Sequence, residues 1–258
     1  TDAAVGGDFA YLCTDSGLEV VDISDPASPA AVGSTSTPVF PRDVAVSGTY
    51  AFVAAVVSGL IAIDISNPAS PILMGVTDLG QDGRRIAVAG RVAYVAGDQV
   101  AVVDISSPDA PTLLERVAVP GEAMGIAVAG GLACVAARYE GLSVLDLSVP
   151  EAPTLAGSVD TPGEALDVAV VGTHAYVADG SSGLQVVDIS DPGSPVIVGG
   201  TPQPPSYGAY AVDAAGSLVY VATGGRVLVI DVSVPSSPVI AGQVELLPGA
   251  NDVVVRAK

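Results

Sequence analysis

Short apolar runs separated by Gly, Pro and polar turns recur along the chain, and residues 43–80 show the pattern most clearly. "DVAVSG" is followed by "TYAFVAA", "GLIAIDIS" and "SPILMGVTDLG", with a turn signal between successive runs. The runs are nearly continuous in apolar residues, which is typical of strands covered on both faces. The pattern therefore predicts four buried strands in this unit and no amphipathic helix.

A six-residue phrase that ends in Pro, first seen as "VDISDP", occurs in six copies. Its Asp residues lie 40 to 43 residues apart, at Asp22, Asp64, Asp104, Asp146, Asp188 and Asp231. A turn glycine recurs with the same period, at Gly7, Gly48, Gly90, Gly130, Gly172 and Gly216. Four residues after it comes a large side chain, at Tyr11, Phe52, Tyr94, Tyr176 and Tyr220, with Cys134 as the exception. This period is typical of a propeller blade of four strands, with an equivalent packing socket in each blade.

We therefore predict an all-β, six-bladed β-propeller with four antiparallel strands per blade, in preference to a parallel β-helix. Residues 1–258 form one domain in this prediction, with repeats at about 2–42, 43–84, 85–124, 125–166, 167–210 and 211–251. Two segments compete to complete the first blade, "DAAV" at 2–5 and "NDVVV" at 251–255. The higher β-propensity of Val favours a closing strand at 252–256, which pairs with the first blade and leaves the first residues as a surplus tail.

The phrases "GLEVVDIS", "GLIAIDIS" and "GLQVVDIS", each before a Pro corner, resemble LVIVD repeats. This is a family of β-propeller repeats in bacterial and archaeal proteins that are commonly secreted or attached to the surface. The resemblance covers essentially the whole chain. It implies a propeller and an extracellular or cell-surface location, and it supplies no catalytic residues to carry over.

The charge balance is strongly acidic, with 28 Asp and Glu against nine Lys and Arg and a net charge of −19. Such a charge repels nucleic acid and anionic lipid headgroups, so neither is an expected partner. The apolar runs are far shorter than the roughly 20 residues of a membrane-spanning helix, so direct membrane insertion is not expected either. The acidity indicates solubility, with cation binding or adaptation to a salty medium as the alternative.

The Asp of each corner phrase is predicted to accept backbone N–H bonds at the turn, so that every blade needs its own copy. Calcium binding is the alternative, because Asp-x-Ser-Asp offers oxygen ligands. Asp25 and Asp191 retain the second carboxylate, but the other four copies do not. We therefore predict no cofactor, with calcium as the alternative.

Catalytic motifs are sparse, and the chain is predicted not to be an enzyme. His174 is the single histidine, which excludes sites that need two imidazoles, and we place it at an exposed turn. Cys13 and Cys134 are predicted to be free and buried, because opposite blades would hold them too far apart for a disulfide. The sequence has neither a Gly-x-Ser-x-Gly nucleophile motif nor a phosphate loop.

Candidate binding residues lie where the units differ, in the loops that a propeller opens onto one face around its channel. These channel-mouth candidates are Arg42, Arg84, Arg85, Arg138, Tyr139, Glu140, Asp167, Tyr207, Tyr210, Asp213 and Arg226. If they converge, a local positive patch could hold an acidic peptide, a carboxylate or a glycan. The expected partner at this face is another protein, a peptide or a glycan. The alternative is that neighbouring Arg and Glu simply pair. Asp213 replaces an Ala found in the other five units, so it must face channel water, find a donor or hold a proton.

Three functional classes follow. The first is a non-catalytic, secreted or cell-surface scaffold that binds another protein or a ligand. The second is a structural subunit of an extracellular assembly such as a surface layer or filament. The third is an enzyme with a channel-mouth site, which would predict a metal in the purified protein.

Overall fold

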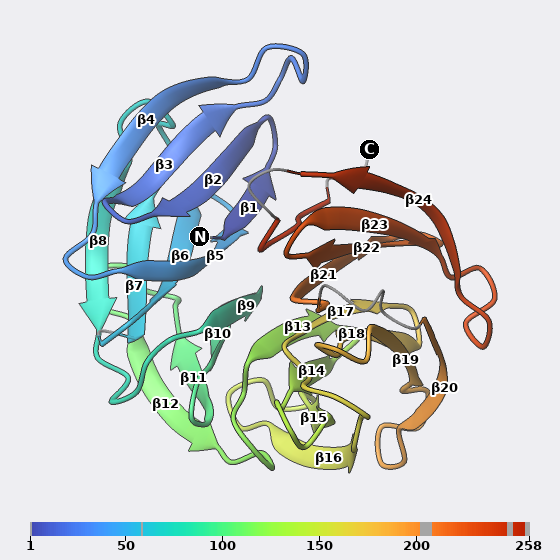
Figure 1. Cartoon of the computed structure of the whole chain (residues 1–258). Helices are drawn as coiled ribbons and strands as arrows, with labels where there is room; N and C mark the ends of the chain where they lie inside the picture. Colours follow the sequence, from blue (N-terminus) through green and yellow to red (C-terminus); the bar gives the residue numbers. More distant parts are fainter. Residues whose placement is uncertain (1, 58, 202–207, 247–249, 256–258) are drawn as a thin grey trace. The chain divides into compact units, whose positions relative to one another are not determined.

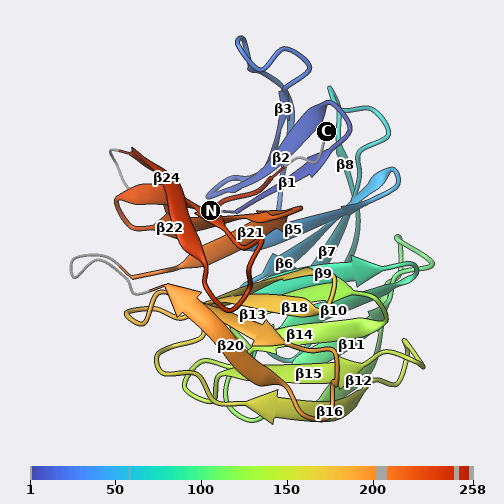
Figure 2. The same ribbon diagram turned by 90° about the vertical axis from the view of Figure 1, so that its right-hand side faces the viewer.

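The computed structural model describes residues 2–57, 59–201, 208–246 and 250–255. Every regular element in these residues is a β-strand. The strands form six four-stranded sheets, and strands that follow one another along the chain are hydrogen-bonded neighbours in the sheet. Figure 1 shows this order in the blade from β1 to β4, and Figure 2 shows it in the blade from β13 to β16. The predicted fold class of six four-stranded propeller blades is confirmed.

The strand bounds follow the predicted period. Blade 1 contains β1 (Ala3–Gly6), β2 (Phe9–Thr14), β3 (Gly17–Asp22) and β4 (Ala30–Ser36). Blade 2 contains β5 (Pro41–Ser47), β6 (Tyr50–Ala55), β7 (Gly59–Asp64) and β8 (Ile72–Thr77). Blade 3 contains β9 (Arg85–Ala89), β10 (Val92–Ala96), β11 (Val100–Asp104) and β12 (Thr112–Val117). Blade 4 contains β13 (Gly125–Ala129), β14 (Leu132–Ala136), β15 (Leu142–Asp146) and β16 (Thr154–Val159). Blade 5 contains β17 (Asp167–Val171), β18 (His174–Ala178), β19 (Leu184–Asp188) and β20 (Val196–Thr201). Blade 6 contains β21 (Ala211–Ala215), β22 (Leu218–Thr223), β23 (Arg226–Asp231) and β24 (Val239–Glu245).

The hairpin between the first two strands of each blade turns at the predicted glycine. All six glycines have left-handed φ angles between 59° and 61°, at Gly7, Gly48, Gly90, Gly130, Gly172 and Gly216. A side chain at this φ would be strained, because its Cβ would crowd the backbone. This turn chemistry explains why the same residue returns in every unit.

The side chain four residues later fills the predicted socket. The buried members of the set are Tyr11, Phe52, Tyr94, Cys134 and Tyr176, each at most 3% exposed. Cys13 and Cys134 are both buried and neither forms a disulfide, as predicted. His174 differs from its prediction. It is the half-buried first residue of β18, where its Nδ1 lies 3.3 Å from the hydroxyl of Thr173.

The corner phrase works as predicted in all six units. The Asp carboxylate accepts a hydrogen bond of 2.8 to 2.9 Å from the backbone N–H of the Ser two residues later, from Ser24, Ser66, Ser106, Ser148, Ser190 and Ser233. Such a turn satisfies a backbone donor where the third strand ends. In Asp64 the N–H and the hydroxyl of Ser66 lower the pKa of the carboxyl group.

The corner of one blade packs against a glycine in the outermost strand of the preceding blade. A Cβ at Gly75 would lie 2.7 Å from the Pro108 carbonyl oxygen, and a Cβ at Gly157 would lie 2.6 Å from that of Pro192. Gly33 and Gly199 approach Pro68 and Pro235 even more closely. The close approach requires glycine at these four positions. Sequence analysis did not single out this glycine, although it recurs with the same period.

The chain divides into two compact units, Thr1–Arg116 with blades 1 to 3 and Val117–Lys258 with blades 4 to 6. Within each unit, neighbouring blades share an apolar core. Tyr11 and Leu18 of blade 1 pack with Ile61 and Ile63 of blade 2, and Val186 of blade 5 belongs to one cluster with residues of blade 6. The single domain over residues 1–258 and its repeat boundaries stay predictions.

The prediction for the closing strand is wrong. β1, and not the C-terminal segment, is the first strand of blade 1, where Gly6 pairs with Phe9 across a two-residue turn. Residues 251–255 lie outside any strand, and residue 256 is outside the described part of the chain. A local hairpin closes a much shorter loop than a strand from the far end, so loop entropy outweighs the better β-propensity of the valines.

Candidate functional site

The turn between the second and third strands contacts the segment that leads into the next blade. In the compact unit Val117–Lys258, Arg138 and Ala165 exchange two backbone hydrogen bonds of 3.1 and 2.8 Å. Gly180 and Ala209 repeat this bridge one blade later, with distances of 3.2 and 2.9 Å. The backbone therefore positions the loops on which several candidate residues lie.

Arg138 links two adjacent repeats through its side chain. Its Nη1 donates a hydrogen bond of 2.8 Å to Oε2 of Glu122, and its Nε lies 3.9 Å from Oε2 of Glu164. Glu122 and Glu164 occupy equivalent positions in two "PGEA" segments. The hydrogen bond to Glu122 is the main cause that raises the pKa of Arg138. These groups are partly exposed and screened by solvent, so the main effect of the ion pairs is to orient the side chain.

Two tyrosines are exposed on these loops. Tyr139 is 59% exposed, and the Cζ of Arg138 lies 4.8 Å from its ring centroid. Arg138 itself has a left-handed φ of 51°, which is uncommon for a residue other than glycine and turns the chain sharply before Tyr139. Tyr210 is 44% exposed and follows the bridge residue Ala209. Both aromatic side chains are therefore presented by loops with fixed backbone contacts.

A buried carboxylate that sequence analysis missed supports the same loops. Asp179 is fully buried, and it accepts hydrogen bonds of 2.6 Å from the Thr161 hydroxyl and 2.9 Å from the Gly163 N–H. Burial raises the pKa of Asp179, and the nearby Asp160 acts in the same direction. The equivalent residues in other units are small or neutral, so no repeated pattern indicated this contact in advance.

The compact unit Thr1–Arg116 contains a separate ionic cluster near the starts of the innermost strands of its three blades. Asp2, Asp43 and Arg85 each stand five residues before a turn glycine, in blades 1, 2 and 3. Arg85 forms an ion pair with Asp2, and its Nη1 lies 4.0 Å from Oδ1 of Asp43. Both carboxylates are buried, so Arg85 is a cross-link between blades. Arg84 beside it lies 4.0 Å from Asp98.

Asp167 and Asp213 link inner strands through the backbone. Asp167 is buried at the start of β17 and accepts a hydrogen bond of 3.0 Å from the N–H of Val212 in blade 6. Asp213 is half-buried and accepts bonds of 2.7 Å from the N–H groups of Ala214 and Val255. Desolvation raises the pKa of Asp213. Of the three options for Asp213, the structure shows hydrogen-bond donors, which are backbone N–H groups.

The remaining candidates are dispersed. Arg42 is exposed in β5, and Glu140 is exposed beside Tyr139. Arg226 begins β23, and its guanidinium lies 3.0 Å from Oε1 of Gln243 and 3.8 Å from Glu245. Tyr207 lies outside the described residues. Four of the five candidate arginines, namely Arg84, Arg85, Arg138 and Arg226, therefore have a carboxylate within 4.0 Å. This geometry favours the alternative of paired charges over an uncompensated positive patch.

Among residues 2–57, 59–201, 208–246 and 250–255, no group of three or more His, Cys, Asp or Glu side chains is arranged to hold a metal ion. The same residues contain no helix with the length and hydropathy needed to cross a membrane.

Comparison with solved structures supports the fold. The β-propeller domain of Cps50 (Swd1) from Myceliophteria thermophila has a TM-score of 0.76 at 14% identity, over 95% of this chain and 85% of that chain. A functionally unknown protein from Desulfotomaculum acetoxidans DSM 771 gives 0.75 at 16% identity, over 93% and 85%. The computationally designed Ika8 protein gives 0.74 at 10% identity, over 99% and 77%. At these identities the likeness shows the class of protein, a β-propeller.

The LVIVD repeat model matches the chain six times, at residues 1–37, 41–78, 80–119, 120–161, 162–201 and 208–245. The chain therefore belongs to the LVIVD repeat family, as its corner phrases indicated. A search of curated proteins found no match.

Proposed function

We propose that this protein is a non-catalytic binding scaffold of the cell surface or extracellular space, and that its partner is another protein, a peptide or a glycan. The proposal assigns contact with the partner to the loops of blades 4 and 5 and to the entry of blade 6. The stacked sheets act as a rigid support, and the loops that vary between repeats supply specificity.

One observation carries the proposal: the Tyr139 side chain is exposed, and the neighbouring side chain and backbone hold its position. Arg138 contacts the ring, Glu122 accepts a hydrogen bond from Arg138, and the Arg138–Ala165 bridge holds the backbone. A preorganised aromatic side chain loses little conformational entropy on binding, and Tyr is enriched among residues that dominate binding energy.

The test is a screen of peptide and glycan arrays with the purified chain, followed by titration calorimetry with each ligand that binds. We expect Tyr139→Ala to weaken binding about tenfold or more, as for a central interface residue. Arg138→Ala should also weaken it, because Tyr139 loses its stacking partner. Val196→Ala is the matched control, since Val196 is 55% exposed on the outermost strand of blade 5. Equal affinity of Tyr139→Ala and the control would contradict the proposed site.

The location is tested separately, by fractionation of the source cells and by protease treatment of intact cells. We expect the protein in the medium or in the protease-accessible surface fraction. Family membership supports this expectation, and recovery only from the cell interior would contradict it.

Assembly is the second candidate function, favoured by the outer edge of blade 2. Ile72, Met74 and Val76 alternate along β8 and are 58%, 38% and 43% exposed. An apolar edge strand is a template for pairing with another chain. Assembly would give concentration-dependent sedimentation that Met74→Glu lowers and Tyr139→Ala leaves unchanged.

A further inference from the structure

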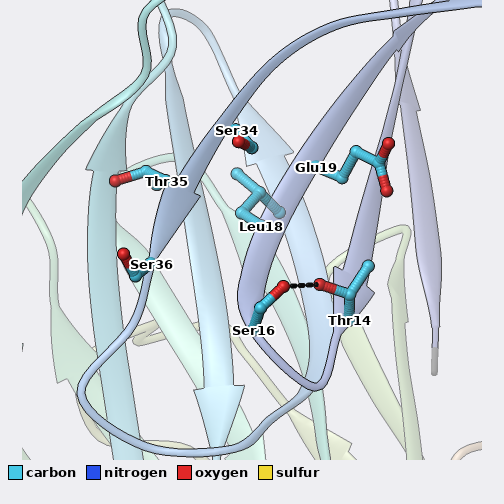
Figure 3. A pocket seen from close by; sticks show the side chains of 7 residues that line it. All are labelled: Thr14, Ser16, Leu18, Glu19, Ser34, Thr35 and Ser36. Carbon is cyan, nitrogen blue, oxygen red and sulfur yellow. Dashed lines mark hydrogen bonds between the residues drawn. The ribbon is translucent and has the colours of Figure 1, made fainter.

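Blade 1 contains a half-open pocket of about 320 Å³, and its lining includes none of the candidate residues described above. Its polar lining consists of Thr14, Ser16, Glu19, Ser34, Thr35 and Ser36. Figure 3 shows these side chains on the end of β2, in the turn that follows it, on β3 and on β4. All of them belong to the first unit.

Strand pairing explains why the polar groups gather on one face. Glu19 pairs with Ser34, and Gly17 pairs with Ser36, so Glu19, Ser34 and Ser36 point to the same side of the sheet. Leu18, which also lines the pocket, belongs with Val20 to the core shared with blade 2, and its pairing partner Thr35 lies on that same side of the sheet. Glu19, Ser34 and Ser36 therefore face away from the core that blade 1 shares with blade 2.

A glycine brings the two strands together at the pocket. Gly17 has a φ of 139°, and a Cβ there would overlap the backbone of Thr35 and Ser36. The backbone of β4 at Ser36 therefore lies beside the turn between β2 and β3. In that turn Thr14 Oγ1 lies 3.1 Å from both the Ser16 hydroxyl and the Gly17 carbonyl oxygen.

A carboxylate at this position of the sheet distinguishes blade 1 from the blades with which it can be compared. The Glu19–Ser34 pair corresponds to Ile61–Val76 in blade 2 and to Leu228–Gln243 in blade 6. Blades 4 and 5 have Ser143–Ser158 and Gln185–Gly200 there. Among these paired positions a carboxylate occurs only in blade 1, so the repeat architecture does not require it.

The chemistry of the lining defines the ligand it would accept. Hydroxyl groups both donate and accept hydrogen bonds, whereas an ionised carboxylate only accepts them and is the stronger acceptor. The lining contains no Arg or Lys, so an anion would meet an uncompensated negative charge. The volume is at the lower end of the range for small-molecule pockets, roughly 300–1,000 Å³. A compact, uncharged ligand with several hydroxyl groups fits these properties.

We propose that this pocket binds a neutral monosaccharide unit, free or at the end of a glycan, with Glu19 accepting hydrogen bonds from its hydroxyl groups. The hydroxyls of Ser34 and Ser36 complete the contacts from β4. This site is independent of the proposed function, which rests on Tyr139 in the other unit.

The experiment uses the whole purified chain and a panel of methyl glycosides of glucose, galactose, mannose and N-acetylglucosamine, with glucuronic acid as the anionic probe. Binding is followed by shifts of backbone amide resonances in two-dimensional NMR spectra at millimolar ligand. We expect at least one neutral glycoside to shift the amides of Glu19 and of Ser34–Ser36. Glucuronic acid should shift them less at the same concentration.

Substitutions then separate the pocket from general surface effects. Glu19→Gln should weaken the neutral glycoside about tenfold, as expected when a charged acceptor becomes a neutral one. Glu115→Gln is the matched control, because Glu115 is also a half-buried carboxylate on a strand of the first unit. Tyr139→Ala should leave this binding unchanged, which separates this proposal from the proposed function.

Two results would overturn the proposal: shifts that map away from blade 1, or glucuronic acid binding as tightly as the neutral glycosides. No response to any glycoside at millimolar concentration would overturn it as well. If Glu19→Gln fails to fold, Ser34→Ala and the map of shifts in the wild-type chain test instead whether the pocket binds the glycoside.

Discussion

The carboxylate of Asp167 in blade 5 accepts a hydrogen bond of 3.0 Å from the backbone N–H of Val212 in blade 6. Asp43 does the same in the first unit, where the N–H of Ile86 in blade 3 lies 2.6 Å from its Oδ2. These bonds join the inner strands of neighbouring blades, which pair with strands of their own sheet on one side only. A buried carboxylate thus substitutes for a missing strand neighbour.

Removing this acceptor should destabilise the second unit. Asp167→Ala leaves the Val212 N–H without that acceptor, which costs about 1–3 kcal/mol when the donor is buried. Asp167→Asn keeps a side-chain oxygen and should lose less. Urea unfolding of the three proteins measures the difference. Equal stability of Asp167→Ala and the wild type would show that the bond contributes nothing.

The glycine that packs beneath four of the Pro corners gives a second prediction with an internal control. A Cβ at Gly199 would overlap the Pro235 carbonyl oxygen, whereas a Cβ at Gly242 meets nothing within 4 Å. Gly199→Ala should therefore destabilise the protein by about 1–3 kcal/mol, as overpacking does, and Gly242→Ala should be tolerated. Thermal unfolding of both variants tests this, and a larger loss for Gly242→Ala would refute the role of the close approach.

The corner carboxylates predict weakening in acid. Hydrogen bonds from the backbone N–H and the hydroxyl of Ser66 lower the pKa of Asp64 below 3.8. A lowered pKa contributes stability above the unfolded value, and this contribution is lost as the pH falls through the folded value. Asp64→Asn keeps the acceptor but does not titrate. The advantage of the wild type over this variant should therefore shrink below pH 3.8. A difference in melting temperature that does not change with pH would contradict this.

Asp213 should show the opposite dependence. Desolvation raises its pKa above 3.8, although the N–H groups of Val255 and Ala214 act against the rise. A raised pKa contributes stability below the unfolded value, which is lost as the pH rises through the folded value. Relative to Asp213→Asn, the wild type should become less stable as the pH rises from below 3.8 toward neutrality. Chemical unfolding at several pH values measures this, and a constant difference would disprove the raised pKa.

Cys134 should be chemically inert in the folded protein. Burial raises the pKa of its thiol to about 12, so almost no thiolate is present at neutral pH. We expect iodoacetamide to modify Cys134 only after unfolding, as read by mass spectrometry. Val149→Cys provides the positive control, since Val149 is 54% exposed. Modification of native Cys134 at the rate of this control would contradict its burial.

Much of the fold follows from local chemistry repeated six times, and sequence analysis recovers that part. The turn glycines, the Asp–Ser corners and the aromatic socket each depend on residues close together in the chain. The strand that completes blade 1 was mispredicted because β-propensity was weighed without the cost of closing a long loop.

Sequence analysis predicted less of the candidate site than of the fold. Arg138 and Tyr139 were found because they break the repeat pattern, but the partners of Arg138 lie in two different repeats. Asp179 occurs in one copy only, and its donors Thr161 and Gly163 come from another loop. Contacts of this kind depend on how one blade packs on the next, which the spacing of residues in one repeat does not encode.

Because β1 pairs with β2 across a two-residue turn, every sheet of the described chain is assembled from four consecutive strands. During synthesis on the ribosome, a sheet can therefore form as soon as its own repeat has emerged, without waiting for later residues. In blades 1, 2, 4 and 5 the corner of the next repeat then covers the glycine of the one before it. The order of translation and the order of sheet formation can thus coincide, which limits the time that apolar edges remain exposed to other nascent chains.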